Sequence, residues 1–185
     1  MYYLLTVDLA AENVYLEQES DQMVSLISGR VLSDDTEAPF RYSMEVDVDE
    51  DGTPMPPRMS AYFPGDSVMH NSLVAALRQA GVDNIQTFPA VIRNDSSGEV
   101  HEDYVVVNVV GLVSCANVQE SETEPLADVY YFHSLVIDPS KTHDMLLFRL
   151  AESQMEIIVH DAVADEIRRG GFPGVVLQPL EERRA

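Results

Sequence analysis

The stretch LLFRLAESQMEIIVHDAVADEIRRGGFPGVVLQPL, residues 146–180, decides the fold class. Two apolar runs predict strands, and a helix should follow from Asp161, its capping residue, to about Arg169. Acidic side chains fall in the early turns of this helix and arginines in its last turn, which is the order that the helix dipole favours. Gly170 and Gly171 end the helix, and a last apolar run predicts a closing strand. A strand–helix–strand unit therefore explains most polar residues of this stretch without any chemistry.

Alternating and β-forming runs predict further strands near the N-terminus. Residues 2–9 should form a first strand with 13–18 as its hairpin partner, and residues 41–49 alternate like a half-buried strand. The segment 21–29 is too short for its periodicity to decide between a helix and a strand. The N-terminal third is therefore expected to be rich in strands.

A proline-rich stretch and another helix come next. Residues 50–65 hold four prolines and predict a loop, which is the best candidate for an internal boundary. An apolar stripe predicts a helix over 66–81, capped by Asp66 or Ser67 and ended by Gly81 in the left-handed conformation.

The middle of the chain predicts a strand pair. The runs 84–94 and 104–115 are separated by a turn signal and should be antiparallel neighbours. The second run is almost entirely apolar, so it should be a central strand covered on both faces. Residues 119–125 predict a solvated acidic loop, and 130–138 another strand.

These elements together predict the α+β class, with a mostly antiparallel sheet and two or three helices. A length of 185 residues suits a single domain over 1–185 with its own core. Within it, residues 1–60 form a more variable, strand-rich portion.

Net charge is the strongest compositional feature. Thirty-two acidic residues face eleven basic ones, for a formal charge of -21. Phosphate backbones and anionic membranes would be repelled, so neither nucleic acid nor a membrane is expected as a partner. A basic protein would be attracted and its association accelerated, although the acidity also suits plain solubility.

Cysteine content and the N-terminus bear on location. One cysteine excludes an internal disulfide framework and a cysteine-rich zinc site. The N-terminus lacks the basic region of a signal peptide, and no apolar run approaches the length that spans a bilayer. Cytoplasmic residence is therefore the default expectation.

The segment DVDEDG, residues 47–52, is the most motif-like in the chain. It matches the first half of a calcium-binding EF loop, but Arg58 stands where the last ligand should be glutamate. An acidic turn is favoured, and weak cation binding there stays open. Histidine spacing fits no zinc site, so we assign no catalytic residue, no cofactor and no metal ligand. An acid–base pair hidden among the many carboxylates stays an alternative.

Several segments carry a resemblance: LVAALRQAGVDNIQTFPAVIRN, EDYVVVNVVGLVSC, SLVIDPSKTHDMLLFRLAES and GFPGVVLQPL. Over roughly residues 64–180 the chain resembles the "immunity eleven" family of bacterial polymorphic-toxin immunity proteins. The resemblance implies a cytoplasmic, non-enzymatic antidote that binds a cognate toxin, and it supplies no catalytic residues. Two alternatives remain. One is a small enzyme that degrades the toxin's product or reverses its damage, and the other is a structural or regulatory component of the secretion locus.

A toxin-binding role predicts an acidic surface with aromatic anchors. The expected contacts are carboxylates of the acidic turn and aromatics in acidic surroundings: Asp47, Asp49, Glu50, Asp51, Tyr42, Tyr62, Phe63, Tyr130 and Tyr131. The alternative for each aromatic is that it packs in the core. Strand edges also suit pairing between copies of the chain, so a homo-oligomer stays open.

Overall fold

The computed structural model describes residues 1–19, 24–33, 35–126 and 129–182. Strands dominate the described residues, with two α-helices, α1 (Asn71–Gln79) and α2 (Asp161–Gly170). Two short 3-10 segments, η1 (Pro139–Lys141) and η2 (Leu180–Glu182), lie late in the chain. The α+β class therefore fits, and no helix among these residues is long and apolar enough to cross a membrane.

One sheet has five strands. Its order is β13 (Val175–Pro179), β1 (Tyr2–Val7), β12 (Ser153–His160), β11 (Leu147–Leu150) and β8 (Leu112–Val113). The predicted hairpin between 2–9 and 13–18 is wrong, because β1 pairs with β12 and β13 instead. Both faces of β1 carry apolar side chains that pack in separate core clusters. Because the strand is buried, its backbone groups need hydrogen-bond partners on both edges.

The other large sheet has six strands. Its order is β2 (Val14–Gln18), β3 (Phe40–Val46), β6 (Ile85–Asn94), β7 (Val100–Val109), β5 (Val68–His70) and β4 (Tyr62–Phe63). The predicted antiparallel pair of β6 and β7 is confirmed. The pairings of β3 with β6 and of β8 with β11 are parallel, and the other pairings of the described strands are antiparallel.

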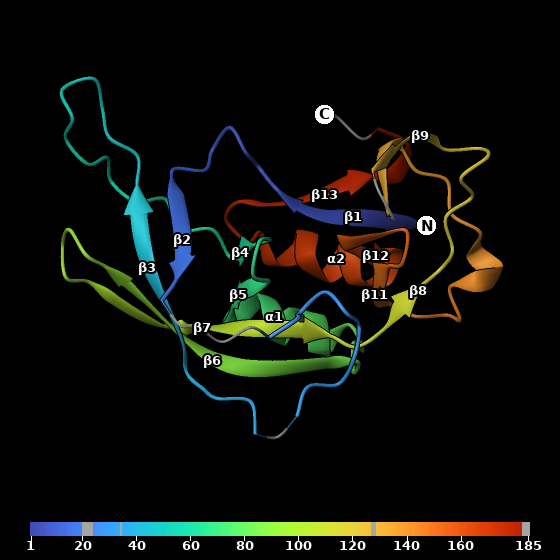
Figure 1. The fold of residues 1–185 in the computed structure, drawn as a ribbon, viewed down its shortest axis with the longest axis horizontal. Coiled ribbons are helices and arrows are strands. Elements are labelled where there is room, and N and C mark those ends of the chain that lie inside the picture. Colours follow the sequence, from blue (N-terminus) through green and yellow to red (C-terminus); the bar gives the residue numbers. More distant parts are fainter. Residues whose placement is uncertain (20–23, 34, 127–128, 183–185) are drawn as a thin grey trace.

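The six-stranded sheet is strongly curved. In Figure 1, β2 and β3 stand steeply across one end of β6 and β7. All six strands contribute buried apolar side chains to one cluster, which includes Val14, Tyr42, Phe63, Ile92 and Val106. The sheet is thus wrapped around its own side chains, which brings its first and last strands towards each other.

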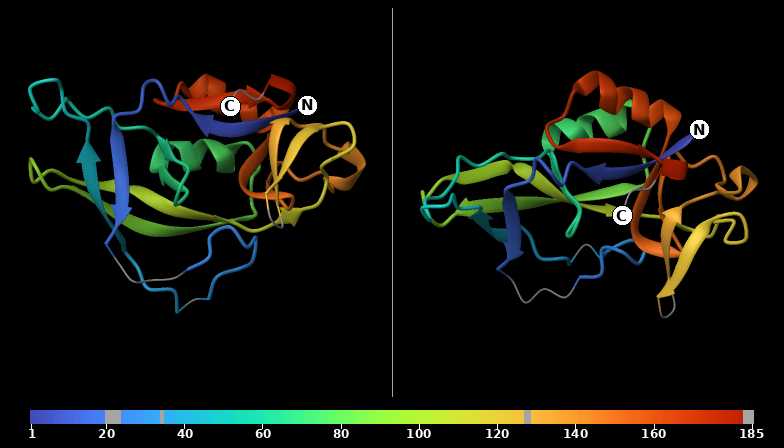
Figure 2. Two further views of the ribbon diagram at one scale, coloured as in Figure 1. Left: turned by 45° about the horizontal axis from the view of Figure 1, so that its top comes forward. Right: turned by 90° about the horizontal axis from the view of Figure 1, so that it is seen from above.

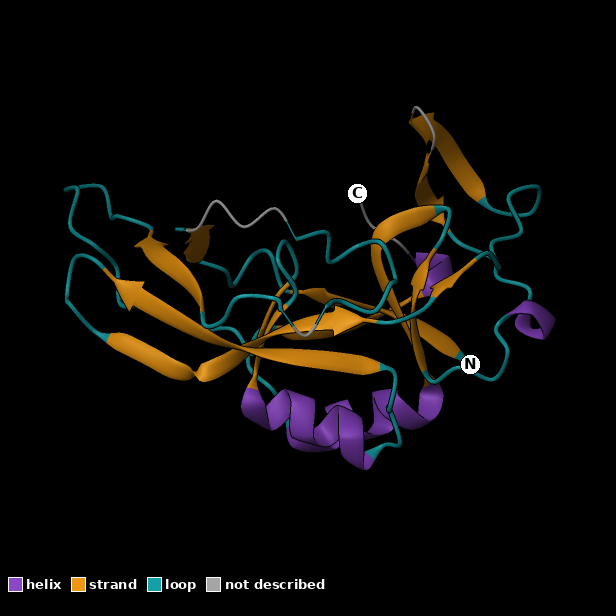
Figure 3. Cartoon of the chain, turned by 60° about the horizontal axis from the view of Figure 1, so that its bottom comes forward, coloured by secondary structure: helices purple, strands orange, loops and turns teal. Residues whose placement is uncertain are grey.

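The two helices lie side by side on one face of the strands (Figure 3). A cluster of buried residues from both helices and both large sheets packs between them, including Leu5, Leu73, Val107, Val159 and Ile167. This cluster also covers one face of β7, while the curved sheet's own cluster covers the other. The prediction that this strand is central and covered on both faces is therefore confirmed.

Both helices have a histidine N-cap where the sequence predicted another residue. Helix α1 starts at Asn71, because Val68–His70 pair with β7 as β5, and His70 is its N-cap in place of Asp66 or Ser67. Helix α2 is capped by His160 in place of Asp161. Gly81 has a φ of 94°, as the predicted left-handed position requires.

A separate hairpin lies at one end of the molecule. It consists of β9 (Glu122–Leu126) and β10 (Val129–Ser134), so the predicted acidic loop over 119–125 is largely a strand. The hairpin packs through Phe132 onto the outer face of the five-stranded sheet. Figure 2 shows it at the end of the molecule opposite β2 and β3.

The described part of segment 21–29, residues 24–29, is neither helix nor strand, and residues 20–23 lie outside the described ranges. The chain after it lies against the curved sheet. The Asn108 side chain donates to the Arg30 carbonyl at 2.8 Å, and the Leu32 N–H donates to Gln86 Oε1 at 2.7 Å. This segment therefore lies against β6 and β7.

Candidate functional site

The segment DVDEDG forms a tight turn after β3. The Asp49 carboxylate accepts the N–H groups of Asp51 at 3.0 Å and of Thr53 at 2.8 Å, and Gly52 has a φ of 78°. This carboxylate therefore serves the backbone of the turn. Among the described residues, no group of three or more histidine, cysteine or acidic side chains is arranged to hold a metal ion.

The turn continues an acidic surface on β2 and β3. Inward side chains of the two strands are buried or half-buried, and the alternate side chains face solvent. Tyr15 lies opposite Glu45, and Glu17 opposite Ser43. We call this surface the acidic face and define it by seven exposed carboxylates: Glu17, Glu19, Glu45, Asp47, Asp49, Glu50 and Asp51. Arg41 is the one basic residue in 13–19 and 40–52, so the acidic face is strongly negative.

Tyr15 is an aromatic residue of this face that sequence reasoning missed. Its side chain is 52% exposed, although tyrosine is usually half-buried or more. Val48 in the turn is also exposed. The available signal was the alternation in VYLEQ, where Val14 and Leu16 point inward and place Tyr15 on the other side.

Three of the predicted aromatic contacts are buried instead. Tyr42 is 0%, Tyr62 1% and Phe63 7% exposed, so the expectation of exposed anchors is wrong for all three. Tyr42 is an inward residue of β3, and the other two form β4, which ends the proline-rich loop inside the packed region. Burial of these three aromatic side chains removes a large apolar area from water.

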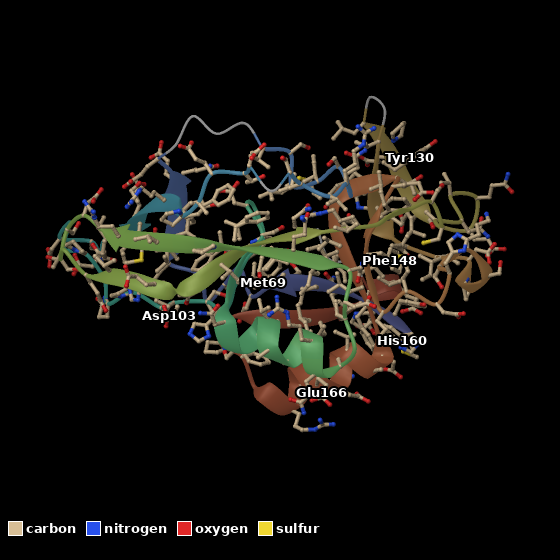
Figure 4. All side chains as sticks on the ribbon, turned by 90° about the horizontal axis from the view of Figure 1, so that it is seen from below. Met69, Asp103, Tyr130, Phe148, His160 and Glu166 are labelled. Atoms are coloured by element: carbon tan, nitrogen blue, oxygen red, sulfur yellow. The ribbon has the colours of Figure 1, made fainter. Side chains whose placement is uncertain are left out.

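Tyr130 and Tyr131 are half-buried on β10. Tyr130 packs on Phe132, with ring centroids 6.1 Å apart, and Tyr131 meets His133 at 5.0 Å. Tyr130 lies beyond the five-stranded sheet, away from the helices (Figure 4). The structure therefore does not bring these tyrosines together with the acidic turn.

A second polar cluster lies at the start of α1. His70 Nδ1 is 2.6 Å from Ser72 Oγ, and His70 Nε2 is 3.0 Å from the carboxylate of Asp103. These groups line a groove of about 320 Å³ together with Tyr104 and Pro173. A serine, a histidine and an aspartate in line are the constituents of a hydrolase triad.

Helix capping explains this cluster better. His70 Nδ1 also accepts the Ser72 N–H at 3.1 Å, so the lone pair that would take a proton from the hydroxyl is already engaged. The start of α2 repeats the arrangement, since His160 Nδ1 accepts the Ala162 N–H at 3.3 Å. Alanine stands there at the position that Ser72 has in α1, so this cap needs no hydroxyl. Figure 4 labels Asp103 and His160 beside the two helix starts. A histidine cap between strand and helix is thus a local structural solution used twice.

By its structure, the chain is a strand-rich α+β protein with a strongly acidic sheet face and a histidine cluster that caps a helix. The model of the immunity protein family Imm11 matches residues 1–182, so the chain belongs to this family. The match also covers the N-terminal third, beyond the segments over 64–180 that carry the resemblance in sequence. No curated protein matches the chain.

Proposed function

We propose that this protein is a cytoplasmic antidote that neutralises a cognate bacterial toxin by binding it in a stoichiometric complex. The observation that carries the proposal is the acidic face in a member of an immunity protein family. Seven carboxylates and one arginine lie on β2, β3 and the turn that follows, and Tyr15 is an exposed aromatic residue among them.

The charge of the face fits a basic partner. Carboxylates on one surface raise the local concentration of a cationic protein and accelerate its docking. An exposed tyrosine surrounded by polar groups has the composition of an interface anchor. The acidic face would therefore steer the toxin and Tyr15 would hold it.

A rescue titration tests the proposal. The protein encoded next to this chain is expressed in a sensitive bacterial host while the amount of the antidote is varied. We expect protection in proportion to the antidote, with co-purification of the two chains. Protection by trace amounts would instead support an enzyme, and co-purification without protection would support a structural or regulatory component of the locus.

Charge reversal tests the contact surface. Asp47, Glu50 and Asp51 change to lysine while Asp49 stays, because its carboxylate holds the turn. At about 0.1 M salt, where the Debye length is ~10 Å, we expect the association rate to fall several-fold.

A matched control reverses the same number of charges elsewhere. Asp83, Glu120 and Glu181 are exposed and lie outside the acidic face, and their change to lysine gives the same net charge. The control should change the association rate by less than about twofold, since screening confines each charge to its own surface. Equal effects of the two triple variants would reject the acidic face as the contact.

A further inference from the structure

A groove separates the two outer strands of the curved sheet. On one side lie β2 and the residues before it, and on the other lies the turn between β4 and β5. Its volume is about 190 Å³, and Glu12, Tyr15 and Leu16 face Pro64 and Asp66 across it. The curvature of the sheet brings these edges near each other, but the described residues place no strand between them.

The edge of β2 that borders this groove presents backbone groups. The N–H of Glu19 donates to the Arg41 carbonyl and the N–H of Asp47 donates to the Asn13 carbonyl, which fixes the hydrogen-bonding phase of the antiparallel pair. The backbone groups of Val14 and Leu16 therefore point away from β3. Both residues line the groove, and among the described residues no strand pairs with them on this side, so a strand can add there.

Two carboxylates give the groove its charge. Glu12 and Asp66 form no ion pair among the described residues, and burial raises the pKa of each above its ordinary value. The Tyr42 hydroxyl is buried and has no hydrogen-bond partner among the described residues, and burial, together with the Asp66 carboxylate, raises its pKa. A cation between Glu12 and Asp66 would compensate their desolvation.

We propose that this groove receives an extended segment of the toxin, which adds as a strand along β2 at Val14 and Leu16 and places a lysine or arginine between Glu12 and Asp66. This inference rests on the proposed function, and it names the partner's chemistry at one place. The acidic face adjoins the same strand, so one toxin surface can contact both.

Other occupants fit less well. A second copy of the chain would bring its own β2, VYLEQ, which carries a carboxylate and no basic residue, so two such edges would repel each other. A small-molecule pocket usually measures roughly 300–1,000 Å³, which is larger than this groove. A strand needs less volume, because its main chain makes the hydrogen bonds along the edge.

Amide hydrogen exchange measured by NMR tests the strand addition. The experiment uses the full chain, free and in complex with the toxin that the rescue titration identifies. The amides of Val14 and Leu16 should exchange at least about tenfold more slowly in the complex. The amides of Tyr15 and Glu17 face β3, so their protection in the free protein serves as the internal control.

A charge variant tests the cationic contact. Glu12→Gln together with Asp66→Asn should raise the dissociation rate at least about tenfold, because a partially buried cation loses both partners. The control Asp83→Asn with Glu120→Gln removes the same charge from exposed positions and should change the rate by less than about twofold.

The outcomes separate the two proposals. If this protein does not rescue the host from any toxin encoded beside it, the proposed function is rejected, and this inference with it. A tight complex in which the Val14 and Leu16 amides exchange as in the free protein would leave the proposed function standing and overturn the inference. Protection of these amides in the free protein, with a dimer in sedimentation, would also overturn it in favour of a second copy.

Discussion

Among the described residues, Arg149 is the largest fully buried side chain, and it joins the two large sheets. It is 1% exposed, and its Nη1 donates to the carbonyls of Gln154 at 3.0 Å and Met155 at 3.3 Å. Its Nη2 donates to Ser67 Oγ at 2.6 Å, directly before β5. Burial lowers the pKa of the guanidinium, and no carboxylate forms an ion pair with it among the described residues. Its hydrogen bonds must therefore offset its desolvation.

A double-mutant cycle between Arg149 and Ser67 measures this joint. Arg149→Met keeps most of the volume, and Ser67→Ala removes the acceptor of Nη2. A hydrogen bond to a charged group contributes about 1.5–3 kcal/mol, and both atoms here are shielded from water. We therefore expect a coupling free energy of about 1.5–3 kcal/mol in urea unfolding followed by circular dichroism.

The protein offers a matched surface control. Arg78 Nη2 donates to Thr87 Oγ1 at 3.1 Å, which is also an arginine–hydroxyl pair, but in an exposed setting. The cycle of Arg78→Met with Thr87→Ala should give a coupling below about 0.5 kcal/mol, because water replaces the lost partner. A coupling between Arg149 and Ser67 that is no larger than this control would refute the assignment of Arg149 as a joint between the sheets.

Three further predictions concern the core and the histidine cluster. Burial raises the pKa of Tyr62 and of Tyr104 to about 12, so their contribution to stability should be complete below about pH 10 and should be lost between pH 10 and pH 12, as urea unfolding at each pH would show. A midpoint that stays constant over this range would contradict the burial of these phenols. Burial raises the pKa of the Cys115 thiol to about 12, so iodoacetamide at about pH 8 should label it slowly in the folded protein and rapidly in urea. Ser72→Ala should leave the rescue titration unchanged, since the N-cap His70 accepts the backbone N–H of residue 72, which alanine keeps. A loss of rescue at unchanged stability would support a hydrolase instead.

Local patterns in the sequence predict the elements that depend on neighbouring residues. The strand–helix–strand unit around α2 is confirmed, with Gly171 in the left-handed conformation at its end. The hairpin of β6 and β7 is confirmed for the same reason, because its turn and its two apolar runs are adjacent in the chain. The acidic character of the turn at 47–52 is likewise evident in its letters.

Pairing between distant strands is decided only by the tertiary structure. The sequence shows that residues 2–9 form a strand, but β12 and β13, more than 140 residues away, compete successfully with the adjacent 13–18. The alternation of apolar and polar residues in 13–18 fits several positions in a sheet, so the sequence does not show which edge of β2 pairs with β3. The same holds for the proline-rich loop, which ends in a buried β4.

Composition and family-specific segments already indicate an acidic member of an immunity family, because charge and local motifs are properties of the chain itself. Exposure is a property of the packed molecule. Tyr42 and Tyr15 are both tyrosines on neighbouring acidic strands, yet one is fully buried and the other is half exposed. The curvature of a six-stranded sheet decides which face is inside, and only burial of apolar area from all six strands together fixes that curvature.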